Sequence, residues 1–125
     1  MKAVLALFSI LFLSVSAVAQ RAHENPKGPN GGQMMDIAGL HAEIVVAGNA
    51  LTFNIFEENG KAVGTKDFSG AALVVVGADR ETVQLKPSAE NALKAELKKQ
   101  PGPGAMITLT LKTAAGKSGQ ARFKL

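Results

Sequence analysis

The chain has 125 residues, with 14 Lys plus Arg against 10 Asp plus Glu and a formal net charge of +4 at pH 7. It contains no cysteine, Trp or Tyr, which excludes a disulfide framework and any thiolate metal site. The positive charge is spread along the chain, with no basic run longer than Lys98-Lys99. We therefore expect no nucleic-acid partner.

Residues 1–19 have the pattern of a secretory signal peptide. Lys2 is followed by a nearly continuous apolar run over residues 3–13, and Ala17-Val18-Ala19 fits the small-x-small cleavage rule. The run is shorter than the ~18 to 20 apolar residues that a membrane span needs. We expect cleavage after Ala19, no membrane span after cleavage, and secretion into a bacterial periplasm.

Residues 20–32 are polar and rich in Gly and Pro, without a hydrophobic period. This composition is typical of a flexible leader. From Gln33 onward, short apolar or alternating runs are separated by turn residues, a pattern typical of an all-β sandwich. We therefore divide the chain into a signal peptide (1–19), a flexible leader (20–32) and one β-domain (33–125).

The predicted strands of this domain follow one another at short intervals. Several alternate between apolar and polar side chains, which indicates one buried and one solvated face. Asn59-Gly60 favours a type I′ hairpin turn. We predict an immunoglobulin-like antiparallel β-sandwich of about seven strands, with the strands at 34–37, 40–47, 51–57, 71–77, 82–86, 106–112 and 119–125.

Residues 88–100 are ambiguous. Ser88 is a suitable helix N-cap and good helix formers follow it. The same segment alternates Leu93, Ala95 and Leu97 with charged residues. We favour a strand because the rest of the domain is β.

The first hairpin carries the candidate metal ligands. A two-residue turn at Ala38-Gly39 would place Asp36 opposite His41 and Met34 opposite Glu43, all on one face. Imidazole binds Zn, Cu and Ni, and thioether favours Cu(I). The predicted metal ligands are therefore His41, Glu43, Asp36 and Met34. The alternative is that Asp36 and His41 form only a solvated cross-strand pair.

His23 is a separate candidate ligand in the leader. A histidine in third position can hold Cu(II) or Ni(II) together with the free amine and two backbone amides. Cleavage after Ala19 leaves His23 fourth, so it would become third only if Gln20 were also removed. The alternative is that His23 has no role in metal binding.

The sequence gives no pattern of an active site. There is no cysteine nucleophile, and Ser69 and Ser118 have no histidine nearby in the sequence. The glycine-rich stretch at residues 28–32 follows no predicted strand and lacks the Lys-Ser/Thr of a phosphate loop. We expect that the protein is not an enzyme.

The stretch "GPNGGQMMDIAGLHAEIVVAGNALTFNIFEENGKAV", with the closing "ARFKL", resembles a family of small secreted bacterial β-sandwich proteins. The same pattern occurs in the periplasmic adaptor subunits of heavy-metal efflux pumps. Typical members have a "GPHGG" element, a "hxVEL"-like strand and an "FxxDxxGKPV" hairpin. This chain has Asn30 at the leader histidine and lacks the Asp of the hairpin turn, and a neutral amide is a poor metal ligand. The resemblance implies a stand-alone accessory domain.

These observations lead to two functional hypotheses. The first is a periplasmic, non-enzymatic binding protein that serves heavy-metal handling or efflux by binding a Cu, Zn or Ni ion. Its partner would then be the ion and an envelope or efflux protein. The second is a protein-interaction module of the cell envelope that needs no metal.

Overall fold

A computed structural model describes residues 26–125. The predicted signal peptide, His23 and the first part of the predicted leader lie outside these residues. The described part is all-β and antiparallel and contains no helix, which confirms the predicted class. It also contains no helix that could cross a membrane.

Eight strands are present where about seven were predicted. The additional strand lies in the ambiguous segment at 88–100, where Ala92–Glu96 is extended, so the preference for a strand is confirmed. The eight strands are β1 (Met34–Ile37), β2 (Leu40–Ala47), β3 (Ala50–Phe56), β4 (Ser69–Val76), β5 (Asp79–Ser88), β6 (Ala92–Glu96), β7 (Met106–Lys112) and β8 (Ser118–Lys124).

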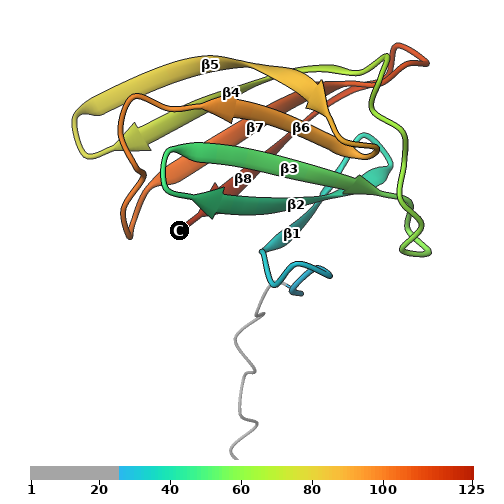
Figure 1. Cartoon of the computed structure of the whole chain (residues 1–125), viewed down its shortest axis with the longest axis horizontal. Helices are drawn as coiled ribbons and strands as arrows, with labels where there is room; N and C mark the ends of the chain where they lie inside the picture. Colours follow the sequence, from blue (N-terminus) through green and yellow to red (C-terminus); the bar gives the residue numbers. More distant parts are fainter. Residues whose placement is uncertain (1–25) are drawn as a thin grey trace, which may run out of the picture.

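The strands form one nearly closed, barrel-like sheet in the order β1-β2-β3-β6-β5-β4-β7-β8 (Figure 1). Strand β5 belongs to both halves of this sheet. Its first seven residues pair with β4, and only Lys86–Ser88 pair with β6. Pro87 lies in this short paired part and donates no hydrogen bond. The two halves are therefore joined through β5 and diverge along most of its length.

The outermost strands, β1 and β8, approach each other without pairing in a ladder. They come close at one end, where a Cβ added to Gly119 would lie 2.8 Å from the backbone nitrogen of Ala38. Glycine at position 119 therefore allows the two edges to meet there.

The turn conformations agree only in part with those predicted from the sequence. Ala38 and Gly39 have φ values of 50° and 77°, as a type I′ hairpin requires. Asn59-Gly60 differs from the prediction, because only Gly60 has a positive φ, at 89°. This turn is closed by the Glu57 amide donating to the Lys61 carbonyl at 2.7 Å. An isolated bridge from Phe56 to Ala62 follows it instead of a second strand.

The core lies inside the curved sheet and collects the inward residues of both halves. Phe53 of β3 and Phe123 of β8 are fully buried, and their ring centroids are 5.5 Å apart. Leu51, Ile107 and Leu109 are also fully buried. Burial of such side chains stabilises a fold by about 1.5 to 3 kcal/mol each relative to exposure, and this chain has no cysteine to supply a disulfide.

Candidate functional site

The first hairpin has the predicted register. Met34 pairs with Glu43, Met35 with Ala42, Asp36 with His41, and Ile37 with Leu40. Since paired residues share a face, the four predicted ligands of the hairpin project from the same side. The structure thus places them on one face, and their individual contacts decide what each can bind.

Glu43 is fully buried, and its carboxylate is engaged by the loop that precedes the hairpin. Oε2 accepts hydrogen bonds from the backbone N–H groups of Asn30 at 2.8 Å and Gly32 at 2.9 Å. Oε1 accepts one from Nδ2 of Asn30 at 2.8 Å. Three donors hold the carboxylate, and bonds to a charged acceptor are stronger than neutral ones. In this arrangement Glu43 anchors the loop.

The loop at residues 26–32 is shaped around this carboxylate. The Gly28 and Gly31 amides donate to the Gly32 and Gly28 carbonyls at 2.7 and 2.9 Å. Gly31 has a φ of 77°, which turns the flanking N–H groups of Asn30 and Gly32 toward one anion, as in a backbone nest. The Pro26 carbonyl also accepts a hydrogen bond from the Met34 amide at 2.9 Å. The described part of the predicted leader, from Pro26 onward, is thus hydrogen-bonded to the domain.

Two glycines of this loop are required by close packing. A Cβ at Gly32 would overlap the backbone oxygen of Ile44, and one at Gly28 would lie 2.6 Å from Sδ of Met34. The same added Cβ at Gly28 would lie 2.5 Å from Oε2 of Glu43. The glycines of "GPNGG" therefore fit a loop that lies directly on β1 and β2.

Asp36 and His41 form a cross-strand pair. Nδ1 of His41 lies 2.7 Å from Oδ1 of Asp36, with the side chains 27% and 87% exposed, respectively. An exposed pair of this kind contributes at most about 1 kcal/mol. The carboxylate orients the imidazole through Nδ1 and leaves Nε2 as the nitrogen for another ligand.

The four predicted hairpin ligands do not converge on one ion. Glu43 is held by the loop, Asp36 by His41, and the Met34 thioether packs beside Gly28. Within residues 26–125, no group of three or more His, Asp or Glu side chains has the arrangement of a metal site. His23 lies outside the described residues.

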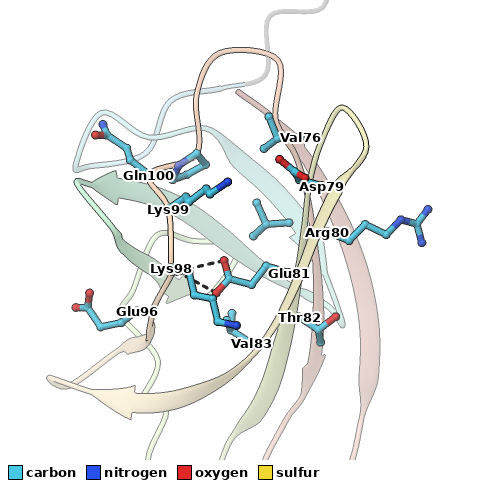
Figure 2. Close-up of a pocket in the computed structure, with 12 residues that line it drawn as sticks. Val76, Asp79, Arg80, Glu81, Thr82, Val83, Glu96, Lys98, Lys99 and Gln100 are labelled. Atoms are coloured by element: carbon cyan, nitrogen blue, oxygen red, sulfur yellow. Dashed lines mark hydrogen bonds between the residues drawn. The ribbon is translucent and has the colours of Figure 1, made fainter.

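A groove of about 660 Å³ lies at the opposite half of the sheet, beside the first part of β5 (Figure 2). The sequence analysis predicted no site at this position. Its lining combines apolar and charged side chains, namely Val74, Val76, Val83 and Pro101 with Asp79, Arg80, Glu81, Glu96, Lys98 and Lys99.

The groove exists because β5 and β6 separate. Beyond Lys94, β6 follows β3, with the Leu97 amide donating to the Asn49 carbonyl at 2.8 Å. No strand of the described chain pairs with the β6 side of β5 from Asp79 to Leu85. The glycine- and proline-rich stretch at residues 101–104 follows β6 and cannot continue a strand.

Glu81 holds one wall of the groove in place. Its two carboxylate oxygens accept hydrogen bonds from the backbone N–H of Lys98 at 3.0 and 3.2 Å. In Figure 2, Glu81 reaches from β5 toward the Lys98 segment, and Lys99 and Gln100 continue that wall. Val76, which is 39% exposed, offers an accessible apolar surface in the groove.

No protein-family model matches the chain, and no curated protein matches it.

Proposed function

We propose that the protein is a non-enzymatic interaction module of the bacterial cell envelope, which holds an extended segment of a partner protein in the groove beside β5. The observation that carries this proposal is that, in the part of the chain that the structure describes, no strand pairs with the β6 side of β5 from Asp79 to Leu85. This side borders a groove of about 660 Å³ that contains exposed Val76.

An added strand would use both features. Main-chain N–H and C=O groups of a sheet edge bind an extended peptide by strand addition, and adjacent pockets select its alternate side chains. Val74, Val76 and Val83 would receive apolar side chains of the partner. Charges of both signs line the groove, from Arg80 and Lys99 to Asp79 and Glu96, and would pair with polar residues of the same segment.

The absence of native cysteine allows a site-specific test. A Thr82→Cys variant carrying a benzophenone maleimide places a photo-crosslinker in the groove. Thr110→Cys places the same label on an exposed position of β7 as a control. In the cells that produce the protein, we expect one discrete adduct with an envelope protein from position 82 and none from position 110.

Two further variants test whether the crosslinked adduct depends on the groove. Val76 lies in the groove and Met106 lies outside it, and they are 39% and 38% exposed. We expect the adduct to disappear in Val76→Gln and to persist in Met106→Gln. Equal adducts from both label positions, or an adduct unaffected by Val76→Gln, would contradict the proposal.

A second candidate function is metal handling through His41. It is supported by Asp36 Oδ1, which lies 2.7 Å from His41 Nδ1 and orients the ring in the way that a carboxylate orients a metal-binding imidazole. Nε2 would bind a Cu, Zn or Ni ion, with Met34, Glu43 and His23 as further candidates. Because Glu43 would have to leave three hydrogen bonds, this function ranks second.

Titration of the secreted chain with Cu(I) under anaerobic conditions, and with Cu(II), Zn(II) and Ni(II), tests this candidate. We expect affinity in the micromolar range or tighter to be lost in His41→Ala and reduced roughly tenfold in Asp36→Asn. His23→Ala measures how much the leader histidine contributes to the metal affinity. Binding only at millimolar concentration, or binding unchanged in His41→Ala, would eliminate the His41 site.

We also propose a more specific fold relationship and a location. The order β2-β3-β6-β5 followed by β5-β4-β7-β8 supports an immunoglobulin-like Greek key, with β5 shared between the two sheets and β1 as an added edge strand. The residue pattern of 1–19 supports secretion to the periplasm. The motif likeness to the β-domains of efflux adaptors supports an efflux or other envelope protein as the partner.

A further inference from the structure

A second opening lies between the two outermost strands. β1 and β8 come close at the Ala38–Gly119 end, but no ladder joins them anywhere in the described chain. Toward Lys124 they leave a hollow of about 650 Å³, lined in part by Gln33, Ile44 and Val46. Within residues 26–125, the outer edge of β8 therefore has no paired strand where it borders this hollow.

A residue that lines this hollow has a buried polar atom without a hydrogen-bond partner among the described residues. Oε1 of Gln33 is buried and receives no hydrogen bond from any residue in 26–125. Gln33 lines the hollow. A buried acceptor without a donor costs about 1 to 3 kcal/mol. Rotation of the Gln33 side chain toward the hollow would let this oxygen accept hydrogen bonds from N–H groups of a ligand there.

The charges around the opening have one sign. Lys27 and Lys124 line the hollow, and among residues 26–125 no Asp or Glu side chain does. Arg122 and Lys124 are exposed on alternate positions of β8. Neither forms an ion pair with a carboxylate of the described residues. An extended segment paired with the last part of β8 would thus lie beside two positive charges, those of Arg122 and Lys124.

We propose that the edge of β8 accepts a partner segment as an added strand, and that this segment alternates acidic with apolar side chains. The acidic residues would lie beside Arg122 and Lys124, since opposite charges on neighbouring strands attract. The apolar residues would point into the hollow over Ile44 and Val46. Backbone N–H groups would donate to Oε1 of Gln33 once that side chain turns toward the hollow. A second copy of β8 does not fit this edge, because it would bring the same cationic positions together.

The test uses two capped seven-residue peptides, one alternating Glu with Val and the other alternating Lys with Val. Binding to the whole secreted chain is followed by calorimetry and by amide chemical shifts. We expect saturable binding of the Glu peptide, weakening at high salt, with shifts along β8 and at Gln33. We expect no saturable binding of the Lys peptide.

Matched double variants locate the interaction. Arg122→Gln with Lys124→Gln should weaken the Glu peptide about tenfold. Lys86→Gln with Lys94→Gln removes the same charge from exposed positions of β5 and β6 and should leave the affinity unchanged. Val76→Gln should also leave it unchanged, so failure of the β5 groove and failure of this edge are distinguishable. Equal binding of both peptides, no binding of either, or equal losses in the two double variants would overturn the proposal.

Discussion

Asn30 and Glu43 are joined twice, through the backbone N–H of Asn30 to Oε2 and through its side-chain amide to Oε1, each at 2.8 Å. Asn30 occupies the position where the resembled family typically has histidine. As a hydrogen-bond donor, the amide serves this buried carboxylate although it is a poor ligand for a metal. The position therefore has a structural use in this chain that does not depend on metal.

Glu43→Gln tests this anchoring. The glutamine side chain keeps one acceptor oxygen, but its NH₂ group would face N–H groups of the loop that need an acceptor. We therefore expect the free energy of unfolding to fall by about 2 kcal/mol. Urea denaturation measures it, with the exposed Glu58→Gln as the control. If both variants lose equally little, the carboxylate does not hold the loop. Amide shifts of Asn30 and Gly32 report the same contact directly.

Gly32→Ala should destabilise the domain by about 2 to 3 kcal/mol, because the new Cβ would overlap the backbone oxygen of Ile44 and must displace β2 or the loop. Gly64→Ala is the matched control, since a Cβ there meets no atom within 4 Å. Gly64→Ala should change stability by no more than about 0.5 kcal/mol. Equal effects in thermal denaturation would show that the loop does not pack as described.

Ala38→Gly should stabilise the protein slightly. Ala38 has a φ of 50°, and the left-handed region costs an L-residue roughly 1 to 2 kcal/mol. Glycine removes that cost. It also makes the unfolded chain more flexible, which lowers the stability of the folded protein by about 0.5 to 1 kcal/mol. The expected gain of about 0.5 kcal/mol is measured by urea denaturation.

Ala78→Gly is the control for this turn. Ala78 lies in the two-residue turn between β4 and β5 and has no positive φ, so glycine brings only its entropic cost there. We expect a loss of about 0.5 to 1 kcal/mol. Changes of the same sign in Ala38→Gly and Ala78→Gly would contradict the backbone argument.

Thr65→Val should destabilise the connection between β3 and β4. Thr65 is fully buried, and its hydroxyl donates to the Ala92 carbonyl at 2.8 Å. Valine keeps the shape and removes this bond, at a cost of about 1 to 2 kcal/mol. The exposed Thr82→Val should stay within about 0.5 kcal/mol of the parent protein. Chemical denaturation that shows no difference between them would remove Thr65 as a tether of β6.

The first hairpin shows which structural features could be predicted from the sequence. Its register followed from Ala38-Gly39 and from alternation, and the structure confirms each pair, because a two-residue turn and the period of a strand are local properties. The segment at 88–100 could not be decided locally. Its helix formers are overridden by pairing with β3 and β5, since β-structure depends on neighbours far away in the chain.

The sequence by itself determined the all-β class, the positions of seven strands and the face shared by Met34, Asp36, His41 and Glu43. Alternation and turn chemistry act over a few residues and are therefore visible without a fold. The tertiary structure decided that Glu43 is buried and engaged by Asn30 and Gly32. It also decided that, within residues 26–125, β5 and β8 each have an edge with no paired strand. Both outcomes depend on which distant segments meet, because burial and edge exposure belong to the assembled sheet and not to any single strand.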